Sequence, residues 1–387
     1  MAKRRITKQI SVGGVKIGGR DNPVVVQSMT TGDTRDVEAC IAEIKTLEDE
    51  GCEIIRVAVP DMEAADAIPA IKAGIGIPLI ADIHFHYELA LASIKQGVEG
   101  LRLNPGNIRD AGKVGEITAA AKKAQIPIRI GVNFGSLPPV GKIGASRGGR
   151  RVVDGVNKLP TIAEAAASGD TDAYTVVDHM VATALWEIGV LEDLDFDDIK
   201  ISLKAFDVET TVEAYRKLAP LMPYPFHLGI TESGTVTTGS IRSAVGLGVL
   251  LYDGLGDTIR VSLAGDSREE VKTGFEILKS LKLRDKGPIM IACPSCGRAD
   301  VDVLKLADSV EKFVKEVKTP LKIAVMGCEV NGPGEAKDAD IGIAGGNGRA
   351  VIFRKGVKTR VVAESEMLEA LMEEVRATEA EMAAAQA

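Results

Sequence analysis

Eight short apolar runs recur through the first two-thirds of the chain, and this repetition permits few architectures. The runs are rich in β-branched residues and alternate with amphipathic segments such as "DVEACIAEIKTLEDEG" and "TVEAYRKLA". Apolar runs of this length suit strands that are buried on both faces of a parallel sheet. We expect strands at residues 23–28, 53–59, 78–82, 100–104, 127–133, 199–204, 226–231 and 258–265.

The number of strand–helix units favours a closed barrel. Eight units in about 285 residues fit a (β/α)8 TIM barrel. A doubly wound open sheet is the alternative, but it would have fewer strands and a glycine-rich turn after the first one. The sequence places no G-x-G-x-x-G between a strand and a helix. We therefore predict a TIM barrel over residues 1–284, with a mobile loop of unassigned role at 137–160.

A second, smaller α/β domain is predicted over residues 285–387. It follows a linker-like segment, "LKLRDKGP", at 281–288. Its expected order is a strand ("IMIA"), a helix, a strand ("LKIAVMG"), a hairpin ("DIGIAGGNGRAVIFRKG") and a final helix. Three of the five cysteines lie in this domain.

Charge and composition exclude several classes of protein. A net charge of −8 argues against nucleic acid as a partner. No window reaches the roughly 18 apolar residues that a membrane span needs, and the basic N-terminal segment lacks the apolar core of a secretory signal. Five cysteines are too few, and odd in number, for a secreted disulfide framework. We expect a cytoplasmic protein.

Polar side chains follow the predicted barrel strands, where TIM barrels place their active sites. The set comprises Arg56, Asp82, His84, His86, Arg102, Asn104, Arg129, Asn133, Lys204, Glu232, Arg260 and Ser262. Five of these are cationic, which predicts an anion with several charges, because arginine forks match phosphate oxygens. "GITESGTVTTGSIRSA" and "SLAGDSREEV" lead into helices whose free amides favour phosphate. The alternative is that some arginines pair with acidic loop residues and are purely structural.

Glu232 and the histidines are ambiguous. Glu232 is either a salt-bridge partner or a proton donor and acceptor beside the substrate, and we expect the second role. His84 and His86 form an H-x-H pattern, a weak metal signal, so contact with the substrate or its surroundings is preferred. His227 lies inside a predicted strand and fits a hydrogen-bonded core histidine.

Cys293, Cys296 and Cys328 each follow an apolar strand. A redox dithiol needs no third cysteine, and structural zinc needs four thiolate or imidazole ligands although no histidine follows position 227. An iron–sulfur cluster with a non-cysteine fourth ligand remains. Glu335, after the "NGPG" turn, is favoured as that ligand, with Glu329 and open coordination as alternatives. A carboxylate binds iron less tightly than a thiolate, so a substrate can displace it. Cys40 and Cys52 are expected to be buried and inert.

The motifs together resemble the family of 4-hydroxy-3-methylbut-2-en-1-yl diphosphate synthases, in their two-domain bacterial form. The resemblance rests on "RVAVP", "ADIHFH", "LRLNPGNI", "IRIGVNFGSL", "GITESG", "RVSLAGD", "CPSCGR" and "MGCEVNGPGEA". It implies an oxidoreductase of isoprenoid biosynthesis, on the methylerythritol phosphate route. Such an enzyme opens 2-C-methyl-D-erythritol 2,4-cyclodiphosphate and removes a hydroxyl, using two electrons from flavodoxin or ferredoxin.

The resemblance also implies roles for individual residues. A [4Fe–4S] cluster would be held by Cys293, Cys296, Cys328 and Glu335, and Glu232 would be the acid–base carboxylate. The diphosphate would be bound by Arg56, Arg102, Arg129, Asn133, Lys204, Arg260 and Ser262. The family works as a homodimer in which each cluster domain caps the barrel of the other subunit.

Two other functions compete with this interpretation. One is a non-redox barrel transferase of the pterin-binding type, with a zinc-stabilised C-terminal domain. The other is a binding module, against which the acidic charge and the polar barrel mouth weigh.

Overall fold

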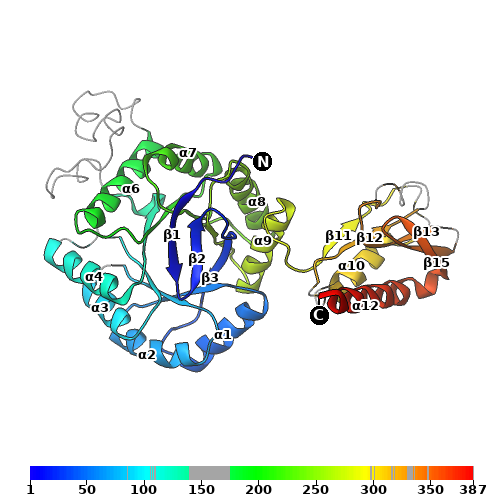
Figure 1. The fold of residues 1–387 in the computed structure, drawn as a ribbon, viewed down its shortest axis with the longest axis horizontal. Helices are drawn as coiled ribbons and strands as arrows, with labels where there is room; N and C mark the ends of the chain where they lie inside the picture. The colour runs from blue at the N-terminus through cyan, green and yellow to red at the C-terminus, as the bar shows by residue number, and fades with distance from the viewer. Residues whose placement is uncertain are drawn as a thin grey trace. The chain divides into compact units, whose positions relative to one another are not determined.

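The eight expected strands form one parallel sheet that curls into a barrel, ringed by helices (Figure 1). In sheet order β8-β7-β6-β5-β4-β3-β10-β9, a bridge between Ile201 of β8 and Phe226, just before β9, joins the two end strands. The strands are β3 (Val25–Met29), β4 (Ile54–Ala58), β5 (Leu79–Asp82), β6 (Gly100–Arg102), β7 (Ile128–Asn133), β8 (Ile199–Lys204), β9 (His227–Leu228) and β10 (Thr258–Ile259). The predicted TIM barrel is confirmed.

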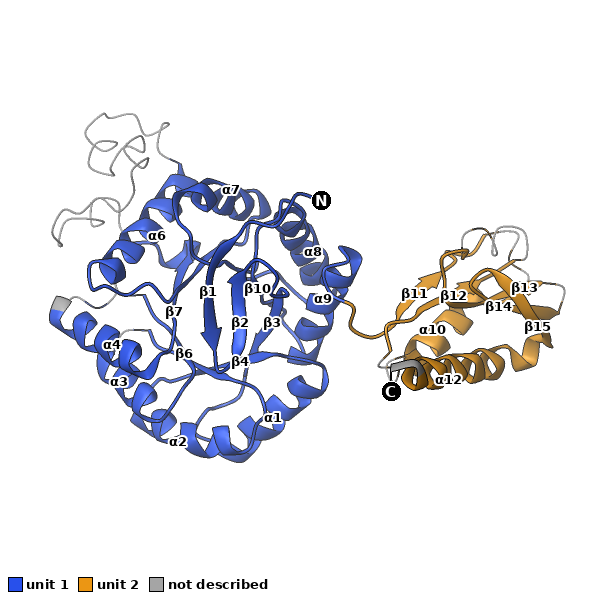
Figure 2. Ribbon diagram, in the orientation of Figure 1, with its two compact units in different colours: residues 1–284 blue, residues 285–387 orange. Residues whose placement is uncertain are grey.

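The computed structural model describes most of the chain in two units, Met1–Arg284 and Asp285–Ala387 (Figure 2). The described residues are 1–84, 86–104, 106, 108, 110–138, 175–296, 299, 301–314, 317, 319–328, 334, 336–346 and 348–386. Glu329, Glu335 and all but the first two residues of the 137–160 segment lie outside them. No described helix combines the length and apolar character that crossing a membrane requires.

Eight helices alternate with the barrel strands in the described part. They are α1 (Val37–Asp49), α2 (Met62–Ala73), α3 (Tyr87–Lys95), α4 (Ala111–Ala124), α6 (Val176–Glu192), α7 (Val208–Leu218), α8 (Val236–Tyr252) and α9 (Ser267–Ser280). An aspartate caps the start of five of them, where its carboxylate accepts a hydrogen bond from a first-turn amide. These caps are Asp36, Asp61, Asp110, Asp207 and Asp266.

Strand β8 shows how the sequence sorts side chains between the two faces of the barrel wall. Successive side chains of a strand point to opposite faces. Ile199, Ile201 and Leu203 belong to the main apolar core. The alternate residues of β8, including Lys200 and Lys204, are also buried, so they face the barrel interior. This interior is polar, unlike the branched apolar filling usual for the fold.

An N-terminal hairpin covers the end of the barrel at which the strands begin. The sequence analysis did not predict this hairpin. Strands β1 (Thr7–Val12) and β2 (Val15–Gly19) pair antiparallel. Gly13 and Gly14 join them with φ of 52° and 92°, as a tight two-residue turn requires. Its apolar side chains Ile10, Val12 and Ile17 pack with Val25, Ile54 and Ile80 at the beginnings or centres of β3, β4 and β5.

The second unit is a five-stranded sheet in the order β11-β12-β13-β14-β15. Its elements are β11 (Ile289–Ala292), α10 (Val303–Val314), β12 (Lys322–Met326), β13 (Ile341–Gly346), β14 (Arg349–Arg354), β15 (Val357–Ala363) and α12 (Met367–Gln386). Strands β11, β12 and β13 are parallel and the last two pairings are antiparallel. β15 was not predicted, and it extends the expected hairpin by one strand.

Candidate active site

Basic side chains gather in the barrel interior and at its mouth. Arg56, Arg102, Arg129 and Lys204 lie in strands of the one barrel, and Arg260 directly follows β10. Lys200, which the sequence analysis did not select, lies two inward-facing positions before Lys204 on β8 and is 1% exposed. Only two carboxylates, Asp82 and Glu270, form ion pairs with these cations among the described residues. The barrel interior therefore carries excess positive charge.

Asp82 is shared between two of the arginines. Its Oδ2 lies 3.5 Å from Nε of Arg56 and its Oδ1 lies 3.4 Å from Nη1 of Arg102. Burial alone would raise the pKa of Asp82, but the charges of Arg56, Arg102 and Arg129 hold it below the ordinary value. Asp82 thus stays ionised and neutralises only part of the charge around it.

Arg129 and Lys204 have no carboxylate partner in the described part of the chain. Arg129 is 3% exposed, and its buried Nε has no hydrogen-bond partner. Burial, with repulsion from Arg56 and Arg102, lowers the pKa of Arg129 well below its ordinary value. Burial likewise lowers the pKa of Lys204 well below 10.5. Burying a basic group without a counter-charge is costly, so two such groups without a carboxylate indicate a site built for an anionic ligand.

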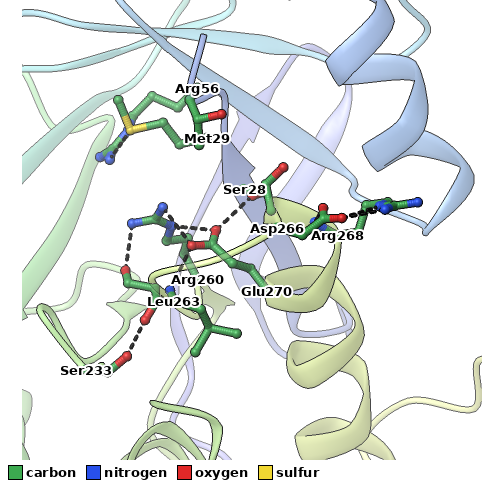
Figure 3. A network of polar contacts seen from close by, with 12 residues as sticks. Ser28, Met29, Arg56, Ser233, Arg260, Leu263, Asp266, Arg268 and Glu270 are labelled. Carbon is green, nitrogen blue, oxygen red and sulfur yellow. Dashed lines mark hydrogen bonds and ion pairs between the residues drawn. The ribbon is translucent and has the colours of Figure 1, made fainter. Parts of the chain in front are cut away.

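Arg260 is held in place by Glu270, a residue of α9 (Figure 3). Its Nε and Nη2 donate to the two carboxylate oxygens at 3.2 and 3.1 Å, and its Nη1 donates to Oγ of Ser262 at 2.6 Å. The carboxylate also accepts hydrogen bonds from Ser28 Oγ at 3.1 Å and from the Leu263 amide at 2.9 Å. Glu270 therefore orients Arg260 and Ser262 together. The sequence offered no signal that set Glu270 apart from the adjacent Glu269.

The Arg56 guanidinium also contacts a thioether sulfur. Its Nη2 and Nε lie 2.8 and 3.2 Å from Sδ of Met29, at the end of the neighbouring strand β3 (Figure 3). Burial lowers the pKa of Arg56 to about 10. A thioether is a weak acceptor, so Arg56 retains most of its capacity to bind an anion.

Two glycines make room for the cations. A Cβ on Gly131 of β7 would lie 2.7 Å from Nε of Arg102. One on Gly229, just after β9, would lie 2.5 Å from Nζ of Lys204. The Gly131 backbone also exchanges two 2.8 Å hydrogen bonds with the Asn104 side chain. Asn104 therefore links the segment after β6 to β7.

Glu232 lies on a constrained turn after β9. Its φ is 55°, a left-handed conformation that non-glycine residues rarely adopt and that costs about 1–2 kcal/mol. Its side chain is exposed, while the next residue, Ser233, is 1% exposed and donates to the Ser262 carbonyl. Arg242 of α8 donates to the Ser233 carbonyl. These contacts hold the Glu232 turn against the Ser262 loop.

The helix starts differ from the sequence expectation. The N-terminus of α9 is capped by the Asp266 carboxylate, whose pKa hydrogen bonds from Arg268 lower to about 2. A phosphate there would meet a negative charge. Helix α8 has Thr235 as its N-cap, and Thr235 makes no side-chain capping bond. The sequence suggested phosphate binding at the N-termini of both helices. Only at α8 are the first backbone amides not capped by a carboxylate.

The remaining predicted barrel residues lie at the ends of their strands. Asn133 is half-buried at the end of β7. His84 and His86 are exposed beyond β5. His227 is 1% exposed, and its Nε2 lies 3.4 Å from Nζ of Lys204. It is thus a hydrogen-bonded interior histidine, as expected, but it faces a site lysine.

The three cysteines sit after adjacent strands of the second unit. Ala292 of β11 pairs with Val325 of β12, so Cys293 and Cys328 follow the carboxyl ends of neighbouring parallel strands. Cys293 is half-buried, and its amide donates to the Val325 carbonyl at 2.9 Å; Cys328 is half-buried and Cys296 exposed. Ser295, between the first two, has φ of 64°. Cys40 and Cys52 are buried in the barrel unit, as expected.

Three cysteines after two neighbouring strands fit the donor chemistry of an iron–sulfur cluster. No group of three or more described His, Cys, Asp or Glu residues is arranged to hold one metal ion. The ligands of a [4Fe–4S] cluster need not converge on one point, because each binds a different iron. Glu335 and Glu329, the two candidates for the fourth ligand, lie outside the described residues.

Comparisons with known proteins cover both units. A family model described as the GcpE TIM-barrel domain matches residues 7–275, and one described as the GcpE protein C-terminal domain matches residues 289–377. A 4-hydroxy-3-methylbut-2-en-1-yl diphosphate synthase (flavodoxin) from Dehalococcoides mccartyi is 51% identical over 375 residues, covering 97% of this chain and 99% of the relative. The protein of the same name from Halalkalibacterium halodurans is 49% identical over 372 residues, covering 96% and 94%.

Solved structures resemble the barrel only weakly. Dihydropteroate synthase from Stenotrophomonas maltophilia is 16% identical with a TM-score of 0.47, covering 71% of this chain and 98% of that one. A likeness of this degree carries no argument about activity.

Proposed function

The chain belongs to the GcpE family, and from this premise we propose that it forms 4-hydroxy-3-methylbut-2-en-1-yl diphosphate by reductive opening of a cyclic diphosphate. The substrate is 2-C-methyl-D-erythritol 2,4-cyclodiphosphate, and the reaction takes up two electrons and releases one hydroxyl as water. Relatives about 50% identical over nearly the whole chain carry this synthase name. Family membership favours this function over a non-redox pterin-type transferase.

One observation of the barrel carries the proposal. Arg129 and Lys204 are buried without a carboxylate partner among the described residues, beside Arg56, Arg102 and Arg260. A diphosphate supplies two negative charges and several acceptor oxygens to such a group. Asn133 and Ser262 add a neutral amide and a hydroxyl at the same end of the barrel. The carbon ring of the substrate would then lie toward the mouth.

Glu232 is proposed as the proton-transferring carboxylate. It is exposed on a turn that Ser233 ties to the Ser262 loop, so its carboxyl group is presented beside the diphosphate site. A carboxyl group there can give a proton to the departing hydroxyl, which leaves as water. The left-handed backbone of Glu232 fits a position where conformation serves function at some expense of stability.

Cys293, Cys296, Cys328 and Glu335 are proposed to hold a [4Fe–4S] cluster. When bound, the cluster would pass the two electrons that the reaction consumes, one at a time, from the external electron donor to the substrate. The parallel ends of β11 and β12 present two of the thiolates, and Ser295 turns the chain between Cys293 and Cys296. Thiolates on rigid strand ends, with one weaker carboxylate ligand, fit a cluster that is open to substrate on one side.

Three further proposals accompany this function. Flavodoxin is the expected electron donor, as the names of the relatives state for those proteins. A homodimer in which each second unit caps the partner's barrel, and a cytoplasmic location, remain expectations from the resemblance and the composition.

Anaerobic purification and turnover test the proposal. The protein should be brown, absorb near about 410 nm and contain iron and sulfide in equal amounts. With a chemical reductant it should convert the cyclodiphosphate to the linear product. Glu335→Ala should retain the three thiolates but lose most turnover. A colourless zinc protein, or full activity in Glu335→Ala, would contradict the cluster assignment.

A further inference from the structure

His227 contacts both a neighbouring strand and a site lysine. Its Nδ1 lies 2.8 Å from Oγ1 of Thr258 on β10, and its Nε2 lies 3.4 Å from Nζ of Lys204 on β8. All three residues are at least 93% buried. The imidazole therefore bridges β8 and β10 from the strand between them, β9.

These contacts determine the tautomer of His227. An ammonium group has donors but no acceptor, so Nε2 must accept whenever Lys204 is charged. Nδ1 then carries the hydrogen and donates to Thr258 Oγ1. In that tautomer Thr258 Oγ1 accepts from Nδ1, and Nε2 is left to accept from Lys204.

The surroundings of the pair favour the uncharged state of both groups. The charged groups that act on them are Arg56 on β4, Arg129 on β7, Lys200 on β8, Arg260 just after β10 and Glu270 on α9. Glu270 is the only anion of this set, and it is already engaged by Arg260. Burial, together with these cations, lowers the pKa of Lys204 and of His227 well below 10.5 and 6.5.

We propose that His227 is a positioning residue that fixes the Lys204 amine, and that this amine takes up a proton only when the anionic substrate enters the barrel. The inference rests on the proposed function, because the cyclic diphosphate is the anion it requires. In the free protein the amine is a neutral hydrogen-bonding partner of His227. When two phosphate charges arrive, they offset the repulsion from the arginines, and the charged amine becomes a ligand of the diphosphate.

This arrangement has a physical advantage for the free protein. An extra permanent charge at Lys204 would add repulsion to a barrel that already has too few carboxylates. A neutral amine avoids that repulsion until the ligand brings its own counter-charge. Gly229 leaves the space the amine needs, because a Cβ there would approach Nζ to 2.5 Å.

Calorimetric titration measures the proton directly. The holoenzyme, without reductant and under anaerobic conditions, is titrated with the cyclodiphosphate near pH 7 in two buffers with different ionisation enthalpies. Each phosphate of the cyclic ligand has a single, strongly acidic hydroxyl, so the ligand itself releases no proton at this pH. The wild type should take up about one proton per barrel, and Lys204→Met about one fewer. Equal uptake by the two proteins would overturn the inference.

The role of His227 is tested by two substitutions that differ in reach. Glutamine can place an acceptor oxygen near the position of Nε2, whereas asparagine reaches only the position of Nδ1. His227→Gln should bind the cyclodiphosphate within about three-fold of the wild type, and His227→Asn about ten-fold or more weakly, as for loss of one hydrogen bond to a charged group. Equal affinity in these two variants would contradict a positioning role.

A second pair of variants, at Thr258, tests the same role without changing residue 227. Thr258→Val removes the hydroxyl that hydrogen-bonds Nδ1 of His227, and Thr258→Ser keeps it. Substrate affinity should fall in Thr258→Val and be retained in Thr258→Ser, and identical affinities would again refute the positioning role. If the wild type fails to bind the cyclodiphosphate at all, the proposed function itself is wrong, and the two failures are thereby distinguished.

Discussion

Replacing Glu270 with glutamine should destabilise the barrel far more than the same change at its neighbour. The Glu270 carboxylate is 4% exposed and accepts four hydrogen bonds, two at each oxygen. Glutamine keeps one acceptor oxygen but replaces the other with an amide nitrogen that cannot accept. Arg260 would thus lose its counter-charge and one of its two bonds to residue 270.

The magnitude follows from the burial of the pair. Removing one partner of a buried ion pair costs about 3–5 kcal/mol. Because the Arg260 side chain is 19% exposed, water screens part of the charge, and we expect the lower end, about 3 kcal/mol. For a unit of this size that corresponds to a fall in Tm of about 6 °C.

The chain contains a single tryptophan, Trp186, and it lies in helix α6 of the barrel unit. Thermal unfolding followed by tryptophan fluorescence therefore reports on the barrel and not on the second unit. Adding the cyclodiphosphate should raise Tm more in Glu270→Gln than in the wild type, because the variant has one more unneutralised cation for the ligand to offset.

Glu269→Gln is the matched control. Glu269 precedes Glu270 on α9 and makes an exposed pair with Lys272 at 2.8 Å, which is worth less than about 1 kcal/mol. If the two variants unfold within about 1 °C of each other, the charge balance attributed to the barrel interior is wrong.

Three other substitutions or treatments give separate tests. Glu232→Gly should raise the free energy of unfolding by about 0.5–1 kcal/mol, because glycine adopts the left-handed backbone without strain, and it should lose turnover. Glu232→Gln should leave stability unchanged. A glycine variant less stable than the wild type would argue against strain at this position. The pKa of His227 is well below 6.5 in the folded protein, so below about pH 6.5 only the unfolded state is protonated at this residue. The free energy of unfolding therefore falls as the pH falls, by up to about 1.4 kcal/mol per pH unit. Urea denaturation of His227→Gln should show a shallower decline, and an unchanged pH profile would disprove this assignment. Burial raises the pKa of Cys40 to about 11 and of Cys52 to about 12. Iodoacetamide near pH 8 should therefore alkylate only the other three cysteines of the folded, cluster-free protein. Labelling of Cys40 or Cys52 at a comparable rate would contradict their burial.

The sequence indicated the barrel well because eight short runs rich in β-branched residues recur at intervals, with helical patterns between them. It did not indicate β1, β2 or β15. Those strands mix polar with apolar residues, and their signal lies in the turns: Gly13 with Gly14, and Lys355 with Gly356, both pairs with positive φ. Such turns join hairpins, and this signal could have identified all three strands.

The basic residues of the site were predictable, but their partners were not. Arg56, Arg102, Arg129, Lys204 and Arg260 stand out because charge is rare within or directly after a buried strand. Glu270 and Met29 become partners only through folding, which joins Arg260 to α9 and Arg56 to β3. Gly131 and Gly229 matter for the side chains they leave room for, a property that no local pattern in the sequence reveals.

We expect the barrel to bind the cyclodiphosphate and the second unit, with its three cysteines, to pass on the electrons. One linear diphosphate should then form for every two electrons consumed. The most direct measurement is anaerobic turnover of the cyclodiphosphate with reduced flavodoxin, with product quantified by mass spectrometry and electrons by flavodoxin absorbance. One molecule of 4-hydroxy-3-methylbut-2-en-1-yl diphosphate for every two electrons is the expected result. Ring opening without consumption of electrons, or flavodoxin oxidation that depends on the cyclodiphosphate but yields no linear diphosphate, would contradict it.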